Sequence, residues 1–151
     1  MDFYAKELLK SGGYTCVIRQ YNGNVVTSNK NGIAPLMDYM ADGQEGAEEA
    51  ADKVIGKSAA LLFIKMGVRR VYGEVMSEHA KQVLEHAHVA YSYGELVPYI
   101  INRQGDGMCP MEKAVLQTDD AERAYCLLKE KLDNMRNNTT KSGGKVDNET
   151  K

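Results

Sequence analysis

The chain has 151 residues, 43% of them hydrophobic, so it is long enough for one domain with a sizeable core and too short for two. Its net charge of -2, with acidic and basic residues interspersed, excludes the basic field that nucleic-acid or anionic-membrane binding requires. The N-terminus lacks the pattern of a signal peptide, and no apolar run approaches the roughly 18 residues of a membrane span. We therefore expect a soluble, cytoplasmic protein. Its three cysteines form no C-x-x-C pair, which argues against a disulfide framework.

The first part of the chain predicts a helix and a β-hairpin. Apolar residues at helical spacing from Phe3 onward are followed by the glycine stop Gly12-Gly13. Residues 14–21 and 24–28 are rich in β-branched residues and tyrosine, and Asn22-Gly23 between them favours a type I′ turn. These residues predict an antiparallel hairpin.

Two helices are expected next. Residues 33–42 have apolar positions at helical spacing and Pro35 in the first turn. After the acidic, alanine-rich residues 44–51, the segment 52–66 is apolar almost all round and stops at Gly67, so we predict a largely buried helix there.

The middle of the chain predicts a βαβ unit. Residues 68–76 are expected to form a strand, 77–86 a helix with Ser77 as its N-cap, and 89–93 a second strand. Such a unit implies parallel strands joined by a right-handed crossover. Together with the hairpin, it predicts an α/β fold with a mixed β-sheet and helices on its faces.

Beyond this unit the pattern is less regular. Residues 96–101 fit a further strand or an ordered loop, Pro110 begins a short helix, and Asp119 or Asp120 caps a final one. From 137 to 151 the composition is polar, so we predict a single domain over 1–136 followed by a disordered tail.

The polar segment 102–113 is the strongest candidate for a site, because Gly105 and Gly107 precede a helix start with Cys109 at the N-cap. A thiol at a helix N-terminus can have a lowered pKa, which makes Cys109 a candidate nucleophile with Glu112 beside it. Alternatively, Cys109 is a small N-cap and Glu112 is the N3 acid of a capping-box-like start. In a binding site, Asn102, Arg103 and Asp106 would supply directional polar groups.

A second cluster is expected at the start of the buried helix. Lys53 and Lys57 are four residues apart, on one helical face, with Asp52 beside them. Two lysines near a helix N-terminus oppose the helix dipole unless an anion lies there, so the cluster would suit phosphate or carboxylate. Alternatively, the helix begins near Ala47, Glu49 pairs with Lys53, and both lysines are merely solvated. None of the histidines stands in a metal-ligand spacing with a cysteine or an acid.

The segments 52–62 (DKVIGKSAALL) and 102–112 (NRQGDGMCPME) resemble an uncharacterised bacterial family, a domain of unknown function assigned to the cytidine deaminase-like superfamily. The resemblance runs from about Tyr14 to Leu132. It implies a three-layer α/β/α sandwich around a mixed sheet, in agreement with the elements expected from the residues.

Zinc deaminases of this fold open one helix with His-x-Glu and the helix after the next strand with Pro-Cys-x-x-Cys. Here the expected helices open with Asp52-Lys53-Val54 and with residues 76–80, which supply neither the zinc cysteines nor the glutamate. The resemblance thus implies a pocket without zinc or another cofactor. In this pocket the first helix would meet the later loop through Asp52, Lys53, Lys57, Asn102, Arg103, Cys109 and Glu112.

These observations leave three functions open. The first is a module whose pocket binds a small anionic or nucleotide-like ligand without chemistry. The second is a metal-independent enzyme in which Lys53 and Arg103 hold charge, Cys109 acts as nucleophile or acid, and Glu112 belongs to the catalytic group. The third is an interaction protein that forms homo-oligomers through the sheet and hairpin edge.

Overall fold

A computed structural model describes residues 3–44 and 46–143 of the chain. Its five-stranded sheet has the order β2-β1-β3-β4-β5. The strands are β1 (Cys16–Gln20), β2 (Val25–Ser28), β3 (Ala47–Ile55), β4 (Arg70–Ser77) and β5 (Ala90–Val97). β1 is antiparallel to β2 and β3, whereas β3, β4 and β5 are mutually parallel. The predicted mixed sheet is confirmed.

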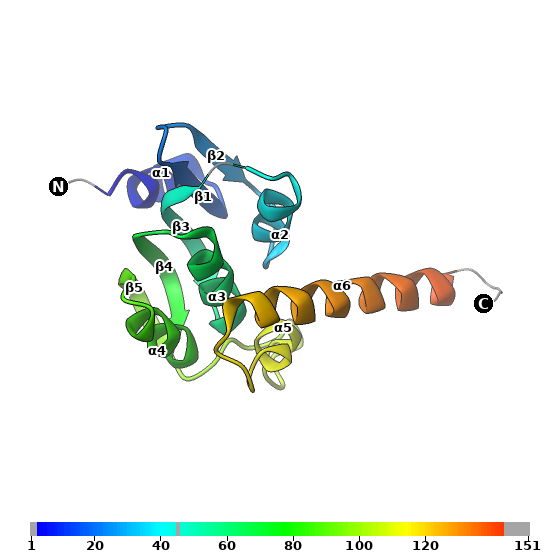
Figure 1. Cartoon of the computed structure of the whole chain (residues 1–151). Coiled ribbons are helices and arrows are strands. Elements are labelled where there is room, and N and C mark those ends of the chain that lie inside the picture. Colours follow the sequence, from blue (N-terminus) through cyan, green and yellow to red (C-terminus); the bar gives the residue numbers. More distant parts are fainter. Residues whose placement is uncertain (1–2, 45, 144–151) are drawn as a thin grey trace.

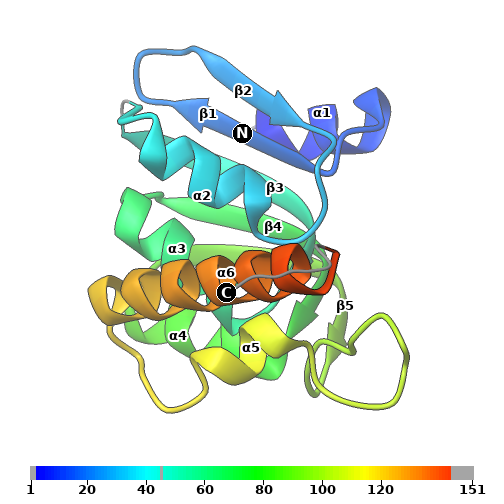
Figure 2. The ribbon, with the colours of Figure 1, turned by 90° about the vertical axis from the view of Figure 1, so that its right-hand side faces the viewer.

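Helices cover both faces of the sheet, which makes the three-layer α/β/α arrangement (Figures 1 and 2). Helix α1 (Tyr4–Gly12) lies on one face, where Leu9 packs with Val17, Ala51 and Tyr72 in a small core. The other face carries α2 (Ala34–Ala41), α3 (Lys57–Met66), α4 (Glu78–His86) and α6 (Ala121–Gly143). The larger core lies between these helices and the sheet, so α3 is buried over its first seven residues, Lys57 to Phe63.

The N-terminal hairpin is confirmed, with Cys16 opposite Ser28 and Arg19 opposite Val25. Its turn differs from the predicted type I′, because Gly23 has a positive φ of 93° and Asn22 does not. The amide of Gly23 donates to the Gln20 carbonyl, and the Gln20 amide donates to the Asn24 carbonyl. Asn22 contributes through its side chain, which accepts a hydrogen bond from the Asn24 amide at 2.9 Å. The loop thus needs only one left-handed residue.

The prediction of a helix from residue 52 is wrong at its start. Residues Ala47–Ile55 form β3, and helix α3 begins only at Lys57, after the N-cap Gly56. The alternative of a helix from Ala47 is wrong for the same reason. Alanine, glutamate and lysine favour helix locally, but this strand lies between β1 and β4, and burial in the sheet overrides that preference. Ala47, Ala50 and Ala51 are fully buried there.

The predicted βαβ unit is confirmed as β4, α4 and β5, and Ser77 caps α4 by accepting from the Ala80 amide at 3.1 Å. Residues after Val97 form an ordered loop with one bridge between Ile101 and Met108, followed by α5 (Pro110–Ala114). Helix α6 is capped by Asp120 and runs past residue 136 to Gly143, whereas a disordered tail was expected from 137. Residues 144–151 of that expected tail lie outside the described residues.

The described part of the chain has no helix that is both long and apolar enough to span a membrane.

Candidate functional site

The side chain of Glu112 lies at the edge of the sheet where the parallel strands β3, β4 and β5 end. Its side chain is only 1% exposed, although it belongs to the short helix α5. One carboxylate oxygen, Oε2, accepts from the Lys57 amide at 2.8 Å and from the Ser77 hydroxyl at 2.6 Å. The other, Oε1, accepts from the Ile100 amide. Glu112 therefore joins the starts of α3 and α4 to the loop after β5.

This carboxylate lies where a ligand of an open α/β sheet would be expected, beyond the carboxyl ends of the strands and at a helix N-terminus. An anion was expected at the start of the buried helix, and the chain supplies it itself. Instead of the expected capping-box contact, Glu112 accepts hydrogen bonds from three other elements.

Gly56 makes room for this arrangement. Its backbone is extended, with φ -90° and ψ -177°, so alanine would be unstrained there. A Cβ atom, however, would lie 2.9 Å from Ile100 Cγ1 and 3.1 Å from Glu112 Oε2, inside normal contact distances.

We expect Gly56→Ala to lower the free energy of unfolding by about 1–3 kcal/mol, because the added methyl must displace a buried and hydrogen-bonded carboxylate. The measurement is urea denaturation of both proteins. Gly46→Ala is the matched control, since its Cβ would meet only the Tyr21 ring, at 3.7 Å. Equal stability of the two variants would contradict this explanation of Gly56.

The lysines of the predicted site do not lie on one helical face. Lys53 is on β3, exposed, and its Nζ is 3.8 Å from a carboxylate oxygen of Glu74. Lys57 is the first residue of α3, and its buried ammonium contacts the Leu116 carbonyl at 3.0 Å and Asp119 at 2.8 Å. This hydrogen bond lowers the pKa of Asp119. Lys57 thus fastens the segment before α6 to the core.

The polar residues of the loop are arranged around Asn102. Its Oδ1 accepts from the amides of Gly105 and Asp106, and its Nδ2 donates to the Asp106 carboxylate at 2.9 Å. Arg103 is exposed on the same loop. Cys109 is the N-cap of α5, as predicted, and its side chain is half-buried. The roles assigned to these side chains in binding or catalysis stay predictions.

Asp52 is buried in β3 opposite Cys16, and its Oδ2 has no hydrogen-bond partner within the described part of the protein. Burial raises the pKa of this carboxyl to about 8, although the Val54 amide and the Cys16 thiol counteract the rise. Burial also raises the pKa of the Cys16 thiol. A carboxyl group that is 5% exposed belongs to the interior rather than to an open ligand site.

The sequence-predicted residues therefore come together only in part. Lys57 and Glu112 are in direct contact, and the loop of Asn102, Asp106 and Cys109 stands next to them through Ile100. Within residues 3–44 and 46–143, no three His, Cys, Asp or Glu side chains are grouped as metal ligands. The starts of α3 (Lys57-Ser58-Ala59) and α4 (Glu78-His79-Ala80) do not fit the zinc set of a deaminase.

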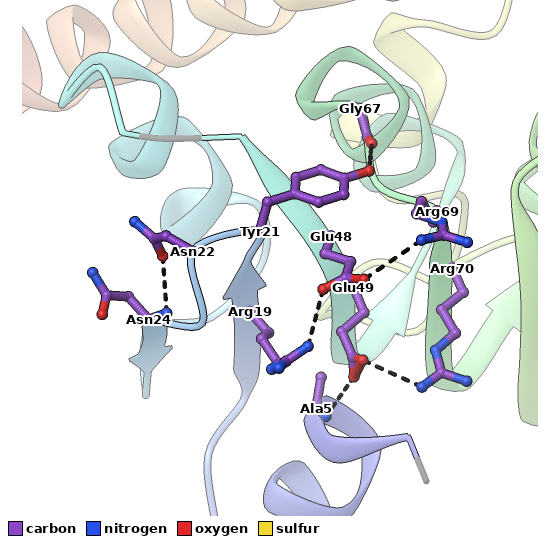
Figure 3. A network of polar contacts seen from close by, with 10 residues as sticks. All are labelled: Ala5, Arg19, Tyr21, Asn22, Asn24, Glu48, Glu49, Gly67, Arg69 and Arg70. Carbon is purple, nitrogen blue, oxygen red and sulfur yellow. Dashed lines mark hydrogen bonds and ion pairs between the residues drawn. The ribbon is translucent and has the colours of Figure 1, made fainter. Parts of the chain in front are cut away.

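A cleft of about 750 Å³ lies at the opposite edge of the sheet, where β3, β4 and β5 begin. Arg19 of β1, Arg70 of β4 and the adjacent Arg69 line it together with Glu48 and Glu49 of β3 (Figure 3). The arginines outnumber the glutamates among these side chains. This cleft is the second candidate site, and sequence reasoning missed it.

An irregularity in the pairing of β1 with β3 explains how neighbouring glutamates share the cleft. Arg19 is opposite Glu49, but the next residue, Gln20, is opposite Ala47, so Glu48 is an extra residue on β3. A bulge of this kind redirects a side chain that would otherwise alternate to the other face. Glu48 and Glu49 consequently both line the cleft.

The two glutamates are held differently. Glu49 is 5% exposed; its carboxylate accepts from the Ala5 amide at 3.0 Å and from Arg70 at 3.3 Å. The Arg70 guanidinium in turn lies 4.1 Å from the centre of the Phe3 ring. Glu48 is 28% exposed and lies between Arg19, at 3.0 Å, and Arg69, at 3.6 Å. Glu49 and Arg70 therefore form a fixed wall of the cleft, whereas Glu48, Arg19 and Arg69 form its more exposed charged rim.

A family profile described as "TM1506: Domain of unknown function (DUF1893)" matches residues 4–132. Among solved structures, the crystal structure of a DUF1893 family protein (TM1506) from Thermotoga maritima is similar to this chain, with 26% sequence identity and a TM-score of 0.75. The match covers 85% of this chain and 87% of that one. No curated protein matches significantly.

Proposed function

We propose that this chain, which belongs to the DUF1893 family, is a binding module for a small anionic ligand, and that the arginine-lined cleft is its binding site. The observation that carries the proposal is the convergence of Arg19, Arg69 and Arg70 on one cleft of about 750 Å³. A volume of this size is within the range of small-molecule sites, and guanidinium groups suit carboxylate and phosphate.

The edge with Glu112 supports this role less well. Its buried carboxylate occupies the anion-receiving position, and Lys57, Asn102 and Asp106 are engaged with partners of their own chain. In the cleft, Arg69 and Arg19 are paired as well, with Glu48, but solvent reaches both: Arg69 is 72% exposed and Arg19 is 35% exposed. We therefore assign ligand binding to the cleft rather than to the pocket expected from the sequence.

Membership of the cytidine deaminase-like superfamily remains part of this proposal. It is supported by the three parallel strands and by the helices α3 and α4, which begin at the carboxyl ends of β3 and β4. A fold of this type does not by itself imply deamination.

We expect Arg69→Ala to weaken binding of anions at least about tenfold, which is the loss of one hydrogen bond to a charged group. The measurement is isothermal titration calorimetry at low ionic strength with phosphate, pyrophosphate, succinate and adenosine monophosphate. Binding should also weaken as salt is added, since the rim is partly exposed.

Arg103→Ala is the matched control, because Arg103 is an exposed arginine on the loop at the opposite edge. Full loss of binding in Arg103→Ala with retained binding in Arg69→Ala would move the site to the edge near Glu112. Absence of binding of any anion to the wild-type protein would overturn the proposed function.

A further inference from the structure

We infer that Glu48 is a built-in competitor for the ligand, and that the ligand is an aromatic molecule carrying one phosphate or carboxylate group. In this inference the anionic group replaces the Glu48 carboxylate between Arg19 and Arg69, while the aromatic ring lies against Tyr4. The inference rests on the proposed function of the cleft, whose ligand class it specifies.

The position of the anionic group follows from the two arginines at the rim. Arg19 is on β1 and Arg69 directly precedes β4, and both approach the carboxylate of Glu48. Two guanidinium groups around one carboxylate form a site that fits another oxyanion of similar size. In the free protein, Glu48 occupies this position.

A ligand anion can displace the Glu48 carboxylate more easily than the Glu49 carboxylate. The Glu48 side chain is 28% exposed, so its carboxylate can turn into solvent when the ligand enters, and its contact with Arg69 is long, at 3.6 Å. Glu49 is 5% exposed and is held through both of its oxygens, by Ala5 and Arg70. Its displacement would leave a buried charge without its partners, which is strongly unfavourable. Glu49 and Arg70 therefore act as positioning residues for the cleft.

The body of the ligand follows from the remaining walls. A cleft of about 750 Å³ is much larger than an inorganic anion requires. Tyr4, the first residue of α1, is half-exposed at its border, and the other walls are the small or apolar residues Gly23, Val25 and Ala90. The partly exposed Tyr4 ring at this border offers an aromatic face that another aromatic ring can cover.

The test uses inorganic phosphate and phenyl phosphate as probes in calorimetric titrations of the full chain. We expect Glu48→Gln, which keeps the size of the side chain and removes its charge, to bind both probes about 5- to 20-fold more tightly. Tyr4→Ala should weaken phenyl phosphate about fivefold and leave inorganic phosphate unchanged. Glu74→Gln is the control for Glu48, because Glu74 is paired with Lys53 away from the cleft.

The outcomes distinguish a failure of the Glu48 and aromatic-ligand inference from a failure of the proposed function of the cleft. If the wild-type protein binds phosphate but Glu48→Gln binds it no more tightly than Glu74→Gln does, the competitor role of Glu48 is wrong and the anion site stands. If Tyr4→Ala weakens both probes equally, or neither, the aromatic part of the inference is wrong. If Arg69→Ala binds phosphate as tightly as the wild-type protein does, the cleft is not the anion site.

Discussion

Replacing Glu112 with alanine is expected to lower the free energy of unfolding by about 3–5 kcal/mol, the largest loss that we expect from one side chain of this protein. The substitution removes one acceptor that three parts of the chain share: the Lys57 amide, the Ser77 hydroxyl and the Ile100 amide all donate to Glu112. A buried donor without an acceptor costs about 1–3 kcal/mol, and the lost side-chain volume adds a cavity.

Glu112→Gln separates hydrogen bonding from packing. The amide has nearly the volume of the carboxylate, but only one of its two ends accepts, so at least one donor among Lys57, Ser77 and Ile100 would face an NH₂ group. We expect Glu112→Gln to lower the free energy of unfolding by about 1–3 kcal/mol, which is less than the loss in Glu112→Ala. Urea denaturation measures both variants, with the exposed Glu130→Ala of α6 as control. A loss below 1 kcal/mol in Glu112→Ala would show that this carboxylate does not join the elements.

The connection made by Glu112 could not be predicted from the sequence. The short pattern Cys109-Pro110-Met111-Glu112 correctly predicts a helix start, and the local interpretation of Glu112 is a contact within that helix. Which distant donors face a side chain depends on how α3, α4 and the loop after β5 meet in space. The order of strands and helices predicts that they meet at one edge, but not which residue occupies it.

The elements that were predicted correctly are those with strong local signals. The Asn22-Gly23 hairpin and the β4, α4, β5 unit follow from turn residues, a serine N-cap and apolar periodicity. The strand Ala47–Ile55 was missed because its alanines and glutamates favour helix, and only its place between two strands makes it extended.

This error also concealed the cleft. Arg19 and the pair Arg69-Arg70 are visible in the sequence as cations within the predicted strands 14–21 and 68–76. Their glutamate partners, however, lie in the segment interpreted as the approach to a helix. With β3 placed beside β1 and β4, alternating charges on three neighbouring strands would have indicated a charged edge. The information was therefore present in the residues but depended on assigning one strand.

The second large effect that we expect is a pH-dependent loss of stability caused by Asp52. Its carboxyl has a pKa of about 8 in the folded protein, against an ordinary value of 3.8, because burial disfavours the charged form. The folded state therefore binds this proton more tightly than the unfolded state. The resulting stabilisation is complete below about pH 4 and is lost as the pH rises through 8, at up to about 1.4 kcal/mol per pH unit.

Asp52→Asn should remove this dependence. Between pH 5 and pH 7 we expect the wild-type protein to lose about 2–3 kcal/mol relative to the variant, since the amide does not titrate. The measurement is the free energy of unfolding by urea at several pH values, and the difference between the two curves cancels the titration of the histidines. Asp106→Asn, the same carboxyl-to-amide change at an exposed position, is the control.

The same variant tests the role that the sequence suggested for Asp52. If the carboxyl is an interior group beside Cys16, Asp52→Asn leaves anion binding at the cleft unchanged while it flattens the pH profile of stability. If Asp52 instead contacts a ligand, binding changes in the variant at a pH where both proteins are fully folded. Parallel stability curves for the wild type and Asp52→Asn would mean that this buried carboxyl does not take up a proton on folding.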